Sequence, residues 1–277
     1  MLSIQLKMKN KLIVIKIGGS TLGQHDTSLE DLAELQKGGT SVVVVHGGGK
    51  IITEWLGKLS SDSLFVNGER VTDKTGLEVA TGVLSGVVNK ELVAGLNSLG
   101  AKALGLSGVD GELLVASPKN PELGYVGNVD KVNTDLLIKI IESGYIPVIS
   151  SISYNATVKP GNEPQTLNVN ADLAAGEISV ALKADKLVFL TDIEGVCDKD
   201  GQLIASLSIQ EAKNLIASGV ANKGMIPKIN SSIRAATTIG TARIIDGRRP
   251  HALLKEIEHS EGGTTIYNKS GEDKNGK

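Results

Sequence analysis

Four charged residues stand where their side chains could take part in chemistry, and two of them are lysines that need an anionic partner. Lys16 lies inside the apolar segment Leu12–Ile17, which predicts a buried strand, and burying an unpaired ammonium costs several kcal/mol. Lys228 follows Pro227 in the first turn of a predicted helix, where the helix dipole disfavours a cation. We therefore expect each lysine to meet a carboxylate or an anionic ligand. The alternative for Lys16 is an ammonium that reaches solvent at the strand end.

Arg70 and Asp172 are the other two candidates. Arg70 follows the turn Asn67-Gly68 and has the geometry to bind a carboxylate through two parallel N–H bonds, although a solvated arginine is the simpler interpretation. Asp172 lies in the first turn of a helix predicted to begin at Asn170 or Ala171. Helix capping alone would explain an acidic residue there.

Glycine clusters follow two of the predicted strands. Gly18-Gly19 ends the first strand, and residues 47–49, all glycine, separate the apolar run 42–45 from a helical segment. Glycines allow main-chain N–H groups to approach a phosphate, and a helix N-terminus attracts anions. Neither cluster is a Walker A or G-x-G-x-x-G motif. One cluster would be explained by a tight turn, but two at the carboxyl ends of parallel strands lie where ligands bind.

Together these residues favour phosphoryl transfer to a carboxylate. No Ser-His-Asp arrangement and no metal-ligand spacing stands out among the four histidines and the single cysteine, Cys197. A carboxylate with an ordinary pKa of about 4 arrives ionised and needs no general base, whereas an alcohol often does. The difficulty is repulsion between two anions, which lysines and N–H groups relieve in the transition state.

The elements that must position these residues are short apolar strands alternating with amphipathic helices. We predict strands over Leu12–Ile17, 42–45, 145–150, Lys186–Thr191 and 242–245, and helices over 134–143, 171–183, 209–218 and 228–239. Strands that are apolar on both faces predict an α/β fold with a mostly parallel sheet covered on both sides. The segment 154–168 predicts a hairpin, and 113–130 is rich in turn residues. A lobe boundary near residue 165 divides the chain into 1–165 and 166–277.

Composition excludes several classes of protein. The 277 residues carry a net charge of −2, and aromatic residues make up only 3%, so we expect neither a nucleic-acid binder nor a disordered chain. One cysteine permits no internal disulfide, which favours a reducing compartment. No apolar run approaches the ~20 residues that span a bilayer. We expect a cytoplasmic protein with no membrane partner and no resident metal.

Seven segments resemble the amino acid kinase family, and in particular its members that phosphorylate N-acetyl-L-glutamate. They span most of the chain in the family's order: KIGGS (16–20), VHGGG (45–49), NGERVT (67–72), NVNAD (168–172), LTDIEGV (190–196), GMIPK (224–228) and GTTI (263–266). The resemblance implies a three-layer αβα sandwich whose N-terminal lobe takes the acyl-amino acid and whose C-terminal lobe takes ATP with its Mg²⁺. The implied product is N-acetyl-L-glutamate 5-phosphate.

Residue roles follow from the same resemblance. Lys16 and Lys228 would stabilise the migrating phosphoryl group, and Asp172 would hold both lysines. Gly19 and Gly48 would bind phosphoryl oxygens. The substrate would be held by Gly48, Gly49, Arg70 and Asn168, and the nucleotide by Asp192, Ile193, Glu194, Gly195, Val196, Cys197, Val220, Ala221 and Asn222.

The resemblance also implies a homodimer formed through a helix near residues 74–99. Arginine-inhibited relatives have an extra N-terminal helix that links dimers into a hexamer, and only fifteen residues precede Lys16 here. The expectation is therefore a dimer with weak or absent control by arginine. Two other functions stay open at this point. One is a kinase for aminoadipate or glutamate carried on an acidic protein, and the other is a non-catalytic ligand sensor.

Overall fold

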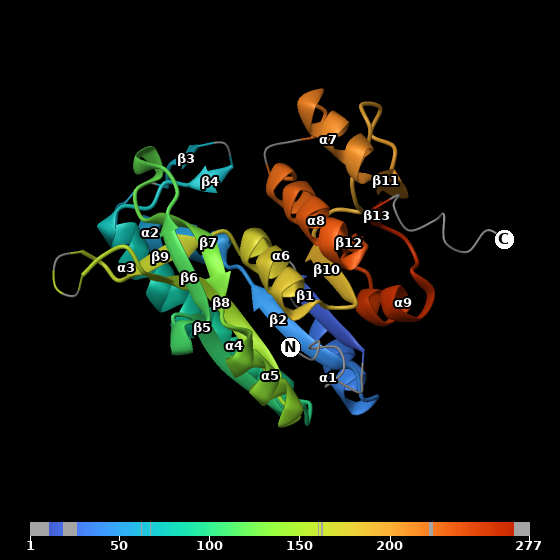
Figure 1. Ribbon diagram of the computed structural model, residues 1–277, viewed down its shortest axis with the longest axis horizontal. Helices are drawn as coiled ribbons and strands as arrows, with labels where there is room; N and C mark the ends of the chain where they lie inside the picture. The colour runs from blue at the N-terminus through green and yellow to red at the C-terminus, as the bar shows by residue number, and fades with distance from the viewer. Residues whose placement is uncertain are drawn as a thin grey trace.

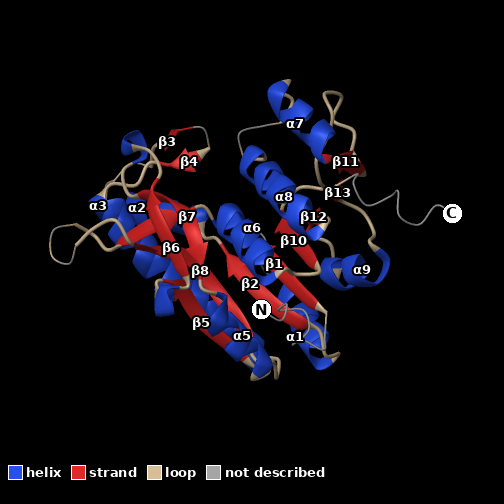
Figure 2. Ribbon diagram, viewed as in Figure 1, coloured by secondary structure: helices blue, strands red, loops and turns tan. Residues whose placement is uncertain are grey.

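The computed structural model describes residues 11–18, 27–61, 63–66, 68–159, 161, 163–221 and 224–268. One sheet of eleven strands runs through the molecule, and helices cover both of its faces (Figures 1 and 2). A separate two-stranded hairpin, β3 (Phe65–Val66) with β4 (Glu69–Arg70), stands at one end. The predicted αβα sandwich is confirmed.

Most of the large sheet is parallel. Its order is β11-β13-β12-β10-β1-β2-β8-β6-β7-β9, with β5 paired to β8. The antiparallel pairs are β12–β13, β6–β7 and β8–β9. The strands are β1 (Leu12–Ile17), β2 (Ser41–His46), β5 (Ala103–Gly108), β6 (Leu114–Pro118), β7 (Val126–Val132), β8 (Ile146–Asn155), β9 (Thr166–Val169), β10 (Lys186–Thr191), β11 (Ser206–Ser208), β12 (Thr241–Asp246) and β13 (Thr264–Tyr267).

The two faces of the sheet form two hydrophobic cores, because successive side chains of a strand point to opposite faces. In β1, Leu12 and Val14 belong to one core, and Ile13, Ile15 and Ile17 to the other. The first core contains side chains of α5 (Thr134–Glu142), α6 (Ala171–Leu182), α7 (Ile209–Ala217) and α8 (Ile226–Ile239). The second contains those of α1 (Ser28–Lys37), α2 (Gly49–Lys58), α3 (Lys74–Thr81), α4 (Asn89–Ser98) and α9 (Ala252–His259).

The predicted elements agree with the structure, with small differences at their ends. β1 and β10 coincide with the predicted strands, and Ser208 forms the expected capping box with Glu211 at the start of α7. α8 begins two residues before its prediction, because Pro227 is compatible with the first turn of a helix. β8 continues past residue 150 and pairs with β9, which confirms the hairpin over 154–168.

One long helical stretch, Lys74–Ser98, consists of α3, a π-helical segment η2 (Gly82–Val88) and α4. Within the described residues it is the stretch that is long and apolar enough to cross a membrane, by length and composition alone. Its buried side chains, including Leu84, Val88 and Leu92, belong to the second core, so this stretch is packed onto the sheet.

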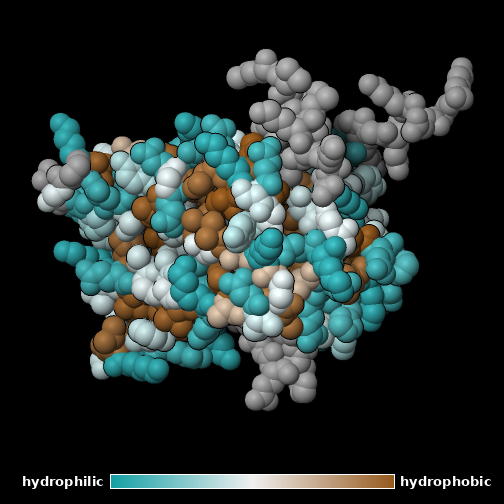
Figure 3. All heavy atoms as spheres, turned by 90° about the horizontal axis from the view of Figure 1, so that it is seen from below, coloured by the Kyte–Doolittle hydropathy of each residue, from teal (hydrophilic) through white to brown (hydrophobic). Residues whose placement is uncertain are grey.

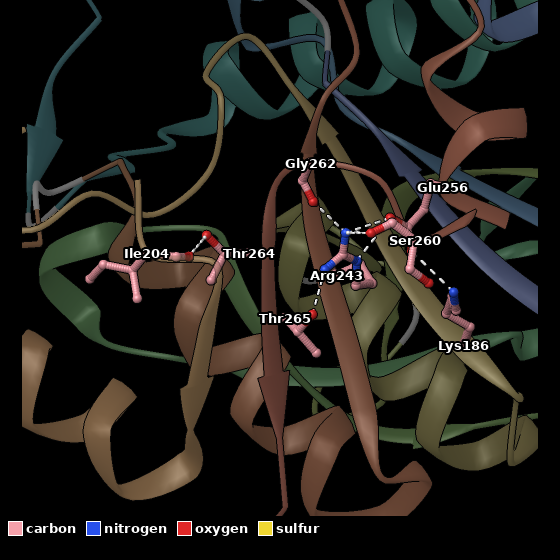
Figure 4. A network of polar contacts seen from close by, with 8 residues as sticks. All are labelled: Lys186, Ile204, Arg243, Glu256, Ser260, Gly262, Thr264 and Thr265. Carbon is pink, nitrogen blue, oxygen red and sulfur yellow. Dashed lines mark hydrogen bonds and ion pairs between the residues drawn. The ribbon is translucent and has the colours of Figure 1, made fainter. Parts of the chain in front are cut away.

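A buried ion cluster fastens the C-terminal elements to the sheet (Figure 4). Arg243 of β12 donates through Nε and Nη2 to Glu256 of α9, at 2.9 and 2.6 Å, and also to the carbonyls of Ser260 and Gly262. Lys186 of β10 donates to the other oxygen of Glu256 at 3.0 Å. Glu256 is fully buried, and two cations pair with its carboxylate, so the buried negative charge is compensated.

Candidate active site

A pocket of about 210 Å³ opens at the carboxyl ends of β1, β2 and β9. Ligands bind at this edge in parallel sheets, because loops and helix N-termini converge there. Six of the residues singled out in the sequence line it together with the neighbouring loops. They are Lys16, Gly48, Gly49, Arg70, Asn168 and Asp172.

Lys16 reaches the pocket because of its place in β1. The alternation of side chains puts it on the same face as Leu12 and Val14, under α6. Its Nζ lies 2.9 Å from Oδ1 of Asp172, in the first turn of that helix. The expectation that Lys16 needs an anion is confirmed, and the solvent-reaching alternative is wrong, since its side chain is only 8% exposed.

Lys228 reaches the same carboxylate from α8. Its Nζ donates to Oδ2 of Asp172 at 3.0 Å. α6 and α8 cross closely at Gly176, where an added Cβ would lie only 3.2 Å from Cβ of Ser231. Asp172 precedes Gly176 by about one turn, and Lys228 precedes Ser231 by about one turn, so the close crossing brings the ion pair together.

Asp172 is free for this role because another residue caps α6. Oδ1 of Asn170 accepts hydrogen bonds from the backbone N–H groups of Asp172 and Leu173, at 2.8 and 3.3 Å. Helix capping therefore explains Asn170 and not Asp172. Oδ1 of Asp172 is buried and has an ion-pair contact with Lys16 but no hydrogen bond of good geometry.

Burial and charge act against one another in this cluster. Burial alone would raise the pKa of Asp172, but the charges of Lys16 and Lys228 outweigh it and hold that pKa below its usual value. Burial lowers the pKa of Lys16 below the ordinary 10.5, and the Asp172 carboxylate only partly opposes this. Two ammonium groups and one carboxylate leave a net charge of +1, which suits an anionic ligand.

The glycine segment 47–49 borders the pocket at the start of α2. Gly48 is the residue before that helix, and its carbonyl accepts the first hydrogen bond, from Ile52 N–H at 3.0 Å. An added Cβ on Gly48 would lie 2.7 Å from Leu84 and 3.3 Å from Val88, so the loop packs directly on η2. The N-terminus of α2 is a favourable place for an anion, as its N–H groups have no earlier carbonyls to bind.

Arg70 and Asn168 line the same pocket from the hairpin and from β9. Arg70 donates to the carbonyl of Gly49 at 2.9 Å and to Thr53 Oγ1 at 2.8 Å, and its guanidinium lies over the ring of Phe65. Burial lowers the pKa of Arg70. Asn168 donates to Thr72 Oγ1 at 3.1 Å. The solvated interpretation of Arg70 is wrong, because this side chain is buried against the glycine loop.

Those residues expected at the nucleotide that the structure describes lie outside this pocket. Asp192 follows β10 directly, and its charge acts on the pKa of Lys16. Residues 193–197 continue from it, while Val220 and Ala221 follow α7. Gly19 and Asn222 lie outside the described residues.

Several residues that line the pocket or support it were not foreseen from the sequence, and four of them are polar or aromatic. Phe65 and Ser151 line the pocket, and Thr53 and Ser63 bond to Arg70. Thr53 lies one helical turn after Gly49, and this spacing is the only sequence signal that could have pointed to it.

Comparison with known proteins places this arrangement in context. The sequence profile of the amino acid kinase family matches residues 11–246. An acetylglutamate kinase from Dehalococcoides mccartyi (strain BAV1) is 44% identical over 257 residues, which cover 93% of this chain and 94% of that protein. An acetylglutamate kinase from Prochlorococcus marinus (strain MIT 9303) is 46% identical over 273 residues, covering 95% and 87%.

Among solved structures, an N-acetylglutamate synthase from Neisseria gonorrhoeae is similar to this chain with a TM-score of 0.82 and 26% identity. The match covers 96% of this chain and 61% of the synthase, whose structure contains coenzyme A and N-acetyl-glutamate.

Proposed function

The chain belongs to the amino acid kinase family, and we propose that it transfers the γ-phosphoryl group of ATP to the side-chain carboxylate of N-acetyl-L-glutamate. The products are N-acetyl-L-glutamate 5-phosphate and ADP, and the reaction is a step of arginine biosynthesis. The identity of 44–46% with acetylglutamate kinases over nearly the whole chain supports this substrate.

The observation that carries the proposal is the pair of lysines held by one buried carboxylate. Lys16 and Lys228 come from opposite halves of the chain, and both bind Asp172 within 3.0 Å. Two ammonium groups fixed at this spacing can contact the phosphoryl oxygens and the bridging oxygen that leaves with ADP. Such fixed charges are most effective in the transition state, where charge develops on these oxygens.

Carboxylate and phosphoryl group repel one another, and the pocket is built to offset that repulsion. Gly48 and Gly49 line the pocket at the start of α2, where the dipole of that helix favours an anion. We assign Gly48 to the phosphoryl oxygens, and Gly48, Gly49, Arg70 and Asn168 to the acyl-amino acid. Arg70 supplies the positive charge that pairs with the second carboxylate of the acyl-amino acid, the one that is not phosphorylated. Gly19 is the second phosphoryl-binding glycine of this proposal.

ATP is assigned to the loops after β10 and α7, with residues 192–197 and 220–222. We assign Mg²⁺ to the phosphates of ATP, with which it enters the site, while Asp172 is already paired with both lysines. We assign the acyl-amino acid mainly to the N-terminal lobe, 1–165, with Asn168 contributed by the start of the C-terminal lobe, 166–277, and the nucleotide to the C-terminal lobe.

The assembly that we propose is a cytoplasmic homodimer formed through the stretch Lys74–Ser98. Its apolar central window is only 39% buried within one chain, and Gly82 and Gly86 are exposed along it. Figure 3 shows hydrophobic residues gathered in the left half of the face seen from below, the half that carries β5 and α3 in Figure 1. Light scattering should give twice the mass of the chain, and a hexamer would overturn this assembly.

The test of the function is trapping of the acyl phosphate. Purified protein, MgATP and N-acetyl-L-glutamate are incubated with hydroxylamine, beside reactions with L-glutamate, aspartate and aminoadipate. A hydroxamate should form efficiently from acetylglutamate alone. The Lys16→Ala variant should lose about 10²- to 10³-fold or more in kcat. Equal signal from unacetylated glutamate, or none from any free acid, would overturn the proposal.

A further inference from the structure

His46 is a fully buried histidine that has no role in the function proposed so far. It is the last residue of β2, directly before the glycine segment 47–49. Its Nδ1 lies 3.0 Å from the carbonyl oxygen of Gly47, and its Nε2 lies 3.1 Å from Nδ2 of Asn89. Both ring nitrogens therefore have fixed partners.

These partners determine which nitrogen carries the proton. The carbonyl of Gly47 can only accept, so Nδ1 carries the hydrogen and donates it. Nε2 is then the acceptor for the Asn89 amide. The orientation of that amide is fixed, because Nδ2 also faces the carbonyls of Leu106 and Val148, at 3.2 and 2.9 Å, and Oδ1 accepts from Lys90 Nζ at 2.9 Å.

The imidazole stays neutral in this environment. The pKa of His46 is lowered to about 4, because burial, with the charges of Lys16 and Lys90, outweighs the bond to the Gly47 carbonyl, which raises it. A second ring proton on Nε2 would also point at the N–H of Asn89. The ring is thus a neutral donor at Nδ1 near neutral pH.

We propose that His46 is a positioning residue, whose Nδ1–H fixes the peptide between Gly47 and Gly48 so that the Gly48 N–H points at the phosphoryl group. In a trans peptide the C=O and the following N–H point in opposite directions. Holding the Gly47 oxygen at the imidazole therefore turns the Gly48 N–H away from His46. This inference rests on the proposed function, since it takes a phosphoryl oxygen to be the acceptor of that N–H.

Asn89 extends the restraint to the helical stretch Lys74–Ser98. It is fully buried at the start of α4, and Gly105 of β5 makes room for it, since a Cβ there would lie 2.1 Å from Asn89 Oδ1. Leu84 and Val88 of the preceding η2 lie against Gly48. The helix thus holds the glycine loop twice, through the His46 ring and through these two side chains.

Two substitutions of similar size separate the roles of the two ring nitrogens. In His46→Asn the side-chain amide can take the place of Nδ1 and still donate to Gly47. In His46→Gln the amide takes the place of Nε2, which keeps the contact with Asn89 and loses the anchor of the glycine loop. We expect kcat of His46→Asn to stay within about threefold of wild type. In His46→Gln, kcat should fall about 10- to 100-fold. This is less than the roughly 10²- to 10³-fold loss in kcat that is typical when a hydrogen-bond donor to the reacting group is removed altogether.

The split between kinetic constants distinguishes positioning from general damage. KM for ATP and acetylglutamate should change less than about threefold in both variants, because the aligned N–H acts mainly in the transition state. Equal kcat in the two variants, with similar thermal unfolding midpoints, would overturn the proposal.

A spectroscopic measurement on the wild-type protein does not depend on activity or on folding of a variant. The ¹⁵N chemical shifts of the His46 ring should be those of the neutral Nδ1–H tautomer from pH 8 to about pH 5. An Nε2–H tautomer or an imidazolium at pH 7 would overturn the inference. Absence of turnover with acetylglutamate, beside the expected tautomer, would instead count against the proposed substrate.

Discussion

At the residue scale, the properties of Lys16 depend on its burial in the middle of a strand. Its side chain is 8% exposed, and burial lowers its pKa below 10.5 although Asp172 lies 2.9 Å away. The ammonium is thus less hydrated than an ordinary lysine, and a phosphoryl group gains more from it than it would in water.

The pH dependence of turnover should report this pKa. Lys16 acts as a cation, so activity is present below its pKa in the folded protein and is lost as pH rises through it. The profile of kcat/KM, which reports the free enzyme, should therefore fall at a pH below 10.5. Lys16→Arg, whose guanidinium stays charged, should move that limb to higher pH in whatever activity remains. A profile that stays flat up to pH 10.5 would contradict this assignment.

The residue types and spacing predicted that Lys16 and Lys228 need anions, but that one carboxylate, Asp172, serves both was implied only by the family resemblance. From the spacing alone, Asp172 was explained equally well by helix capping. The structure resolves this, because Asn170 provides the cap and Asp172 turns to the lysines. Lys16 and Asp172 lie 156 positions apart in the sequence, and the alternation of side chains in β1 and the packing of α6 over it bring them together. Only the fold supplies that proximity.

At the element scale, the crossing of α6 and α8 controls the site. The two helices approach closely because Gly176 has no side chain, and Lys228 is carried to Asp172 by this approach. Strands such as β1 and β10 could be predicted to the residue, since their apolar runs end sharply at polar or glycine residues. The π-helical segment η2 could not be predicted from the sequence, because its residues are equally compatible with an ordinary α-helix.

A larger side chain at Gly176 should separate the two helices. In Gly176→Val the Cβ would already lie 3.2 Å from Cβ of Ser231, so α8 must move and Lys228 must withdraw from Asp172. We expect kcat to fall by about tenfold or more, and stability by about 1–3 kcal/mol from overpacking.

The matched control is Gly57→Ala, a helical glycine of α2 with nothing within 4 Å of an added Cβ. It should leave kcat unchanged and stabilise the protein by up to about 1 kcal/mol. Steady-state kinetics and urea unfolding measure both variants. Unchanged kcat in Gly176→Val would show that the crossing does not position Lys228.

At the scale of the whole molecule, one continuous sheet joins the two halves of the chain, and α1 and α9 join them again on one face. Asp31 of α1 is buried and accepts hydrogen bonds from the backbone of Leu253 and Leu254, at 3.1 and 3.3 Å. Its other oxygen lies 2.8 Å from Nδ1 of His251. The first described helix thus caps the last one.

Removing this cap should destabilise the chain as a whole. Asp31→Ala loses an N-cap and leaves two N–H groups of α9 without their acceptor, which costs about 2–3 kcal/mol. Glu30→Ala, on the exposed side of the same helix, should change stability by less than about 0.5 kcal/mol. Urea unfolding measures both, and equal midpoints for the two variants would contradict the bridging role of Asp31.

The central claim is that a carboxylate oxygen attacks the γ-phosphorus of ATP with Lys16 and Lys228 beside it. The most direct test uses N-acetyl-L-glutamate labelled with ¹⁸O in its side-chain carboxylate, and follows the products by ³¹P NMR. The expected result is an acyl phosphate whose phosphorus signal carries the isotope shift of a bridging ¹⁸O. Release of unlabelled inorganic phosphate in step with ADP, with no acyl phosphate, would show transfer to water and contradict the claim.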